Sequence, residues 1–166
     1  MVNVITRRAD SSDTERIVQL RLLAQKHFER SNSSIWRITE IGKQLLRQKV
    51  QKDLADDNVR VFLAEIDREA IGYVQGEVSR RNDYSPRTVG QISLIYVTKR
   101  YRRRGIGRRL MRELCNFFES RRAKQLTVRY IIGNREAEGF WNKLGFKPII
   151  TTGSTYLKEL NLTILS

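Results

Sequence analysis

Arg102-Arg103-Arg104-Gly105-Ile106-Gly107 lies between a short apolar run and an amphipathic segment. The run before it, residues 89–97, is rich in β-branched residues, which predicts a buried strand. After it, apolar residues recur at four-residue steps, at Ile106, Leu110, Leu114 and Phe118. This spacing is typical of a helix that packs one face against a core. We therefore expect the two glycines to lie where a strand turns into a helix.

Such a junction can bind a pyrophosphate group. The N-terminus of a helix exposes unpaired N–H groups and carries a partial positive charge. Glycine lets the backbone approach an anion closely, and arginine adds paired N–H donors. The segment Arg102–Gly107 therefore predicts an anion site. Arg103 and Arg104 are also compatible with a solvated run of charge that binds nothing.

A second motif follows, Asn134-Arg135-Glu136-Ala137-Glu138-Gly139-Phe140-Trp141-Asn142-Lys143-Leu144-Gly145-Phe146. It holds an Asn, an Ala three residues later, an aromatic pair and then Gly-Phe. Together with Arg-x-x-Gly-x-Gly after an apolar strand, it resembles the paired motifs of the GNAT family of N-acetyltransferases. The resemblance implies an α/β (α+β) fold, a mixed and mostly antiparallel twisted sheet flanked by helices. In that fold two parallel central strands splay apart, and segments 89–97 and 125–132 suit these places.

The resemblance also implies acetyl-CoA as co-substrate and no metal. Backbone groups matching Ile95, Tyr96 and Val97 would pair with the pantetheine arm. The pyrophosphate would lie on a cradle of Arg102, Arg103, Arg104, Gly105, Ile106, Gly107 and Arg108. Asn134 would reach the pantetheine or phosphate region. Without the resemblance, Ile95 and Val97 are equally compatible with core positions, and Asn134 with a helix cap.

The implied activity is transfer of an acetyl group to a primary amine, by direct attack in a ternary complex. The acceptor is a protein α-amine, a lysine or a small-molecule amine. The sequence departs from the family at both acid–base positions. Many members carry Glu on the fourth strand, where this chain has Gln91 and Ser93. Many carry Tyr seven residues after the motif Asn, where this chain has Trp141, which is no practical proton source.

Three explanations are open for the missing acid and base. A water relayed through Ser93 or through backbone carbonyls can act as base, with Tyr130 as the acid; Tyr96 and Tyr156 are weaker candidates for the acid. A substrate amine of low pKa can need little help. The protein can also bind acyl-CoA without transferring it efficiently. His27, the one histidine, is expected to be a surface or packing residue.

Positive charge is concentrated in the middle of the chain. The net charge is +14, and residues 80–135 hold 16 Lys and Arg against 3 Asp and Glu. A pyrophosphate site needs only part of this excess. The remainder is compatible with steering toward an acidic protein or a nucleic acid, or with solubility alone. The alternative function is therefore a non-catalytic module that binds acyl-CoA, an acidic partner or nucleic acid.

Length and composition favour one domain over residues 1–166, since 40% hydrophobic and 30% charged residues suit a globular protein. No apolar run approaches the roughly 20 residues that span a bilayer, so no membrane partner is expected. Cys115 is the one cysteine, and the N-terminus lacks the layout of a signal peptide, which favours a cytoplasmic protein. A monomer and a homodimer are both compatible with the sequence.

The remaining elements follow from periodicity and turn residues. Ser12–Glu15 reads as a capping box before a helix with Ile17, Leu20, Ala24 and Phe28 on one face. A second helix should place Ile38, Ile41, Leu45, Val50 and Leu54 on one side. Strands are expected at 2–8, 59–66, 70–78, 146–150 and 154–162, a loop at 79–88, and helices at 105–121 and from 134 to Gly145. A tight polar turn at Asp67-Arg68-Glu69 should join the strands 59–66 and 70–78 into a hairpin.

Overall fold

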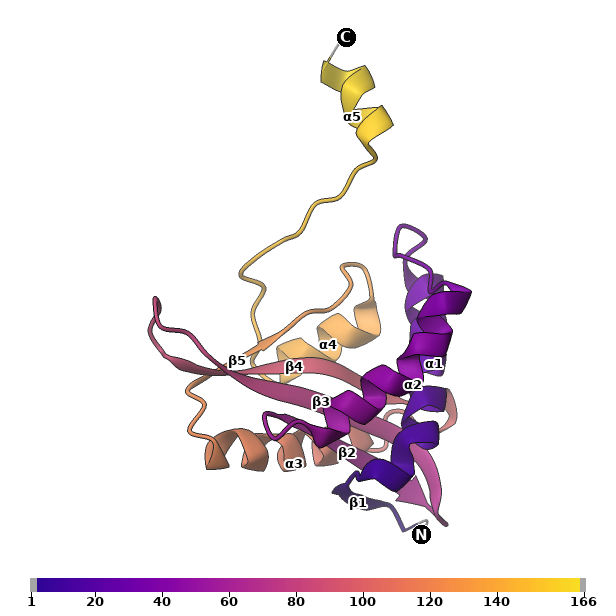
Figure 1. Ribbon diagram of the computed structural model, residues 1–166, viewed down its shortest axis with the longest axis vertical. Helices are drawn as coiled ribbons and strands as arrows, with labels where there is room; N and C mark the ends of the chain where they lie inside the picture. Colours follow the sequence, from indigo (N-terminus) through magenta and orange to yellow (C-terminus); the bar gives the residue numbers. More distant parts are fainter. Residues whose placement is uncertain (1–2, 165–166) are drawn as a thin grey trace.

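The computed structural model describes residues 3–164, and its strands form one five-stranded sheet (Figure 1). The strands are β1 (Ile5–Arg8), β2 (Val59–Ile66), β3 (Glu69–Arg80), β4 (Thr88–Val97) and β5 (Gln125–Val128). They lie in the order β1-β2-β3-β4-β5, and every pair is antiparallel except the parallel pair β4–β5. The mixed, mostly antiparallel sheet expected from the sequence is confirmed.

Helices cover both faces of this sheet (Figure 1). They are α1 (Thr14–Ser31), α2 (Glu40–Ala55), α3 (Ile106–Ser120) and α4 (Arg135–Lys143). A further helix, α5 (Leu157–Ile164), lies away from the sheet (Figure 1). Successive strand residues point to opposite faces, so Tyr73 packs with α1 and α2 while Val74 packs with α3. The sheet therefore separates two apolar cores.

The predicted hairpin is confirmed and is closed by two residues. Ile66 pairs with Glu69, and Asp67 and Arg68 between them have φ values of 50° and 66°. Positive φ at both central residues gives a two-residue turn whose twist matches that of the strands. The hairpin is longer than expected, because β3 continues to Arg80 and leaves a loop of 81–87.

The predicted parallel strand 125–132 is shorter than expected, and this shapes the site. β5 pairs with β4 from Val89–Gln125 to Ile92–Val128 and ends there. β4 continues to Val97, paired on its other side with β3. Beyond Ile92, β4 therefore has no strand partner on the β5 side, and the two strands part. A register shift opposite Gln75 and Gly76 leaves Ser93 as an extra residue at this point.

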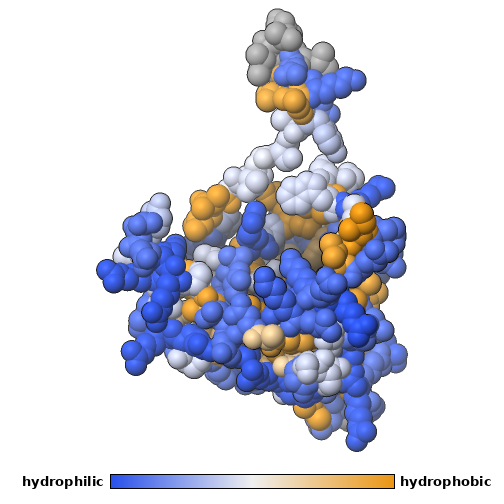
Figure 2. Space-filling model, in the orientation of Figure 1, coloured by the Kyte–Doolittle hydropathy of each residue, from blue (hydrophilic) through white to orange (hydrophobic). Residues whose placement is uncertain are grey.

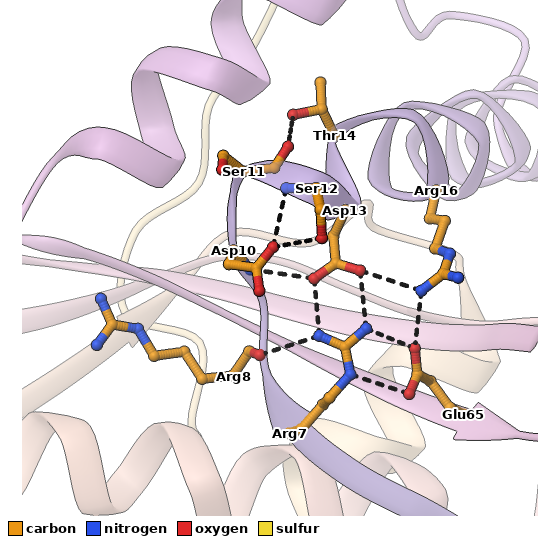
Figure 3. A network of polar contacts seen from close by, with 9 residues as sticks. All are labelled: Arg7, Arg8, Asp10, Ser11, Ser12, Asp13, Thr14, Arg16 and Glu65. Carbon is orange, nitrogen blue, oxygen red and sulfur yellow. Dashed lines mark hydrogen bonds and ion pairs between the residues drawn. The ribbon is translucent and has the colours of Figure 1, made fainter. Parts of the chain in front are cut away.

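An ion-pair network ties β1 to the start of α1 (Figure 3). Arg7 donates to Asp13 at 2.7 Å and to Glu65 on β2 at 2.6 Å, and Arg16 also contacts both carboxylates. The predicted capping box at Ser12–Glu15 is wrong. The box lies two residues earlier, because Asp13 accepts from the Asp10 N–H and Asp10 accepts from the Ser12 N–H. It opens a short 3₁₀ turn, Ser11–Asp13, before α1.

The predicted apolar face of α2 is only partly buried. Val50 is buried, whereas Ile41 and Leu45 are 67% and 52% exposed. Leu46, Val50 and Leu54 pack on the sheet core. The second half of α2 thus supplies most of the core contact, and apolar spacing alone overestimates what is buried.

The predicted strands 146–150 and 154–162 are wrong. After Gly145 the chain runs out from the body without regular structure, and α5 follows at its end (Figure 1 and Figure 2). Ile149, Ile150 and Tyr156 are exposed. A strand needs a neighbour for its backbone groups, and Pro148 has no N–H to give. Residues 157–160 (Leu-Lys-Glu-Leu) are good helix formers, so the local preference prevails there.

Candidate active site

A cavity of about 850 Å³ opens where β4 and β5 part. Its walls come from β4, the start of α3, the segment after β5, α4 and the later part of α1. Every predicted site residue except Arg104 lines it: Ser93, Ile95, Tyr96, Val97, Arg102, Arg103, Gly105, Ile106, Gly107, Arg108, Tyr130 and Asn134. Arg104 lies with its Cζ 5.9 Å from the ring centre of Tyr101. The fold thus gathers residues from both motifs around one space.

The strand-to-helix junction predicted at the glycines is confirmed. Gly105 is the N-cap of α3 with φ +79°, and no side chain caps this end. The first intrahelical bond runs from Arg109 N–H to the Gly105 carbonyl at 3.1 Å. The N–H groups of the first turn therefore have no helical partner, and they lie beside the cavity. This is the chemistry that an anionic group requires.

Arg102 behaves differently from its neighbours. Its Nε donates to the Val97 carbonyl at 2.9 Å, and its Nη1 pairs with Glu136 on α4. Its Cζ lies 5.5 Å from the ring centre of Tyr96, and its side chain is 20% exposed. Arg103 and Arg108 are exposed at the cavity and carry the charge available to a ligand.

β4 presents side chains to the cores and its free edge to the cavity. Ile95 and Val97 pack with α3, while Leu94 and Tyr96 pack toward α1 and α2. The same residues line the cavity because no strand covers this part of β4 on the β5 side. A core position and a place beside a ligand are therefore compatible for Ile95 and Val97.

Asn134 is buried and caps α4. Its Oδ1 accepts from the Ala137 N–H at 3.2 Å. The capping role that the sequence left open is thus present, and contact with a ligand stays a prediction. Gly133, before it, has φ +85°, which helps the chain turn into α4.

The candidate acid and base differ in how they are placed. Ser93 is exposed in the cavity, and Tyr130 lines it half-buried. Trp141 is 3% exposed and packs edge-on against Phe140 and Phe146, with ring centres 5.0 and 5.2 Å away. Trp141 is thus a core residue. Tyr156 lies exposed on the C-terminal segment and does not line the cavity.

His27, expected at the surface or in packing, lines this cavity from α1. Its Nε2 lies 3.8 Å from Glu136 Oε2, and its ring centre lies 6.4 Å from that of Tyr96. Burial, and then the nearby Arg102 cation, lower the pKa of His27 below its usual value. Sequence reasoning missed His27 and Glu136. The one sequence signal that could have identified them is their position: His27 precedes Phe28 on a predicted helix face, and Glu136 lies inside the second motif.

Within residues 3–164, no three His, Cys, Asp or Glu side chains group closely enough to hold a metal ion. Burial raises the pKa of the half-buried Cys115 thiol, which disfavours the reactive thiolate. In the same part of the chain, none of the helices has the length and apolarity to cross a membrane.

Proteins of known structure share this fold. A model of the Acetyltransferase (GNAT) family matches residues 22–146. The fold is similar to that of a tetramutant of the BH1408 protein from Bacillus halodurans, with TM-score 0.80, 19% identity, and 92% of this chain and 99% of that one covered. It is also similar to aminoglycoside N-acetyltransferase AAC(6')-Iy in complex with CoA (TM-score 0.73, 15% identity, 94% and 95% covered).

A third similar structure is ribosomal-protein-alanine N-acetyltransferase from Brucella melitensis biovar Abortus 2308 (TM-score 0.67, 15% identity, 93% and 100% covered). Among curated proteins, no sequence matches this chain. At these identities the solved structures establish the shared fold, and the family match extends over both motifs.

Proposed function

Because the chain belongs to the GNAT acetyltransferase family, we propose that it transfers an acetyl group from acetyl-CoA to a primary amine. The observation that carries this proposal is the cavity between β4 and β5, with the uncapped start of α3 at its wall. We infer one cytoplasmic domain over residues 1–166, since its single cysteine requires no oxidising compartment.

The residues present fit the acyl carrier. The first-turn N–H groups at Gly105–Arg108, with Arg103 and Arg108, would hold the pyrophosphate. The free edge of β4 at Ile95–Val97 would pair with the pantetheine arm. Arg104 and Arg102 support this site less directly, because one lies outside the cavity wall and the other is paired with Glu136. The bound carrier would supply an activated thioester.

The chain would then position and polarise the reacting groups. A strand N–H near Ile95 or Tyr96 would stabilise the oxyanion that forms on the thioester carbonyl. Tyr130 is the proposed proton donor to the leaving sulfur, since it lines the cavity and Trp141 has no acidic proton to give. Ser93, exposed at the register shift of β4, would hold a water there.

The acceptor class is proposed at the level of a primary amine. Similar structures include an aminoglycoside N-acetyltransferase and a ribosomal-protein-alanine N-acetyltransferase. Aminoglycosides and peptides with a free α-amine are therefore the first acceptors to assay, followed by lysine peptides and polyamines.

The first test is calorimetric titration with acetyl-CoA at about 0.15 M salt, where long-range attraction is screened. Inorganic pyrophosphate is the control for charge alone. Saturable binding to acetyl-CoA, well above that to pyrophosphate, followed by thiol release with at least one amine, supports the proposal. Equal and weak binding to both ligands contradicts it.

A second function is favoured by one surface. The Cζ atoms of Arg60 and Arg121 lie 4.8 and 5.6 Å from the ring centre of Phe117. Burial, and then the charges of Arg8 and Arg121, lower the pKa of Arg60. Such crowded cations would bind a polyanion, for example a nucleic acid. Anisotropy of labelled RNA across about 0.05 to 0.3 M salt tests this, because phosphate contacts weaken steeply with salt.

A further inference from the structure

His27 and Glu136 come from separate parts of the chain and lie next to each other at the cavity. His27 lies on α1 and Glu136 in the first turn of α4, and both line the same cavity as Tyr96 and Ser93. Their nearest atoms, Nε2 and Oε2, are 3.8 Å apart. This is too long for a hydrogen bond between them. Glu136 Oε2 already accepts from Nη1 of Arg102, and a carboxylate oxygen can accept a second hydrogen bond. A donor that enters the cavity can therefore reach this oxygen and the His27 Nε2 together.

A substrate ammonium fits this gap. Hydrogen bonds from nitrogen are about 2.8–2.9 Å long, so one nitrogen can reach both atoms when these are 3.8 Å apart. Glu136 would attract the cation, and the imidazole would accept a second N–H. Tyr96, whose ring centre is 6.4 Å from that of His27, would form the adjoining wall.

We infer that His27 and Glu136 form the amine-binding end of the site, with His27 as the general base. This rests on the proposed acetyltransferase function. Glu136 binds the incoming ammonium, and one N–H bond breaks as its proton passes to the imidazole. The free amine forms the new C–N bond to the thioester carbonyl, and the C–S bond breaks with its electron pair on sulfur. The proposed donor Tyr130 gives its hydroxyl proton to that sulfur and takes up the extra proton of the adduct nitrogen, and the imidazolium releases its proton to solvent.

The charges around His27 suit a base that works near neutral pH. Arg102 and Lys99, from the segment after β4, and Arg30, from α1 itself, disfavour a protonated imidazole. Glu136, from α4, favours it, and burial outweighs that effect. His27 is therefore held neutral around pH 7. This supplies the function for which Gln91 and Ser93 are chemically unsuited.

Steady-state kinetics with the full chain test the base. His27→Gln keeps a polar side chain but cannot take the proton, so kcat should fall about 100-fold at pH 7. The deficit should shrink as pH approaches the pKa of the substrate amine, because the amine then loses its proton unaided. KM for acetyl-CoA should stay unchanged. Lys26→Gln, on the same helix turn but exposed and outside the cavity wall, is the control.

Glu136→Gln separates binding from proton transfer. We expect KM for the amine to rise at least tenfold, with KM for acetyl-CoA unchanged. The assignment of the base would be overturned if His27→Gln had a kcat within twofold of the wild-type value and the same acidic limb in its pH profile. An unchanged amine KM in Glu136→Gln would overturn the assignment of the ammonium site.

Nuclear magnetic resonance gives a readout that needs no acceptor. His27 is the one histidine in the sequence, so in tag-free protein its ring signals are unambiguous. They should titrate below about 6.5 and shift when acetyl-CoA is added. If the His27 ring signals do not shift when acetyl-CoA binds, the placement of His27 in the active site is overturned, even if no acceptor is found. Failure of acetyl-CoA to bind at all would instead refute the proposed function itself.

Discussion

Gly107 faces the ring of Phe140, and a Cβ placed on Gly107 would lie 3.1 Å from Cε2 of that ring. The contact joins α3 to α4. Gly105, the other glycine of the motif, has open space where a Cβ would lie, but its φ is +79°. The two glycines therefore have different reasons to lack a side chain. One allows two helices to pack closely, and the other allows the backbone turn that starts α3.

Gly105→Ala should weaken acetyl-CoA binding at least tenfold, because a methyl group would intrude on the anion cradle. The free protein should lose about 1 kcal/mol from the strained φ. Gly145→Ala is the matched control, since Gly145 has φ +86°, equally open space and no place in the cavity wall. Calorimetry and thermal unfolding measure the two effects. Equal affinities in the two variants would show that the cradle lies elsewhere.

Gly107→Ala should be less stable than Gly139→Ala. Both glycines are helical, so alanine should stabilise each by roughly 0.5–1 kcal/mol. Gly139 has nothing within 4 Å of a new Cβ, whereas Gly107 must displace Phe140. We expect a difference of about 1 kcal/mol in the free energy of unfolding, measured in urea. Equal stabilisation would mean that the contact between α3 and α4 is loose.

Asp13→Asn should remove about 2–3 kcal/mol of stability at pH 7. Asp13 is buried under Arg7, and Arg7 is partly exposed, which moderates the loss. The hydrogen bonds of Arg7, more than any other contact, hold the pKa of Asp13 below its usual value. A lowered folded pKa stabilises the fold above the unfolded pKa, and this contribution disappears as pH falls through the folded value.

Unfolding free energies measured between about pH 7 and pH 2 give this comparison. The wild-type protein should lose its advantage over Asp13→Asn toward the acid end of that range. Asp83→Asn, at an exposed loop position, is the control and should track wild type. A constant gap between wild type and Asp13→Asn at every pH would contradict the assignment.

Arg102→Gln should raise the pKa of His27. After burial, the Arg102 cation has the largest effect in lowering that pKa, and its removal also frees Glu136, which acts in the opposite direction. The acidic limb of the activity profile should therefore move to higher pH. Arg100→Gln, at an exposed position outside the cavity wall, is the control. Ring signals of His27 followed from pH 4 to 8, roughly the span around its usual pKa, give the shift directly.

Much of the fold could be predicted because it depends on local pattern. The β2–β3 hairpin, the junction before α3 and the end of α4 at Gly145 all follow from apolar spacing and turn residues. Errors arose where local pattern needed a distant partner. Asp13 pairs with Arg7, and the capping box begins at Asp10 instead of Ser12. The segment after Gly145 pairs with none of the strands in residues 3–164.

The candidate site divides in the same way. The sequence by itself determined the strand-to-helix junction before α3, because Arg102–Arg108 is a continuous segment whose geometry follows from a strand meeting a helix. The free edge of β4 at Ile95–Val97 depends on where β5 ends, which the sequence did not predict. Only the tertiary structure decided that Trp141 is buried, that Arg102 pairs with Glu136, and that His27 faces the cavity. These contacts join residues far apart in the chain. They depend on how the helices cross the sheet, which no local pattern specifies.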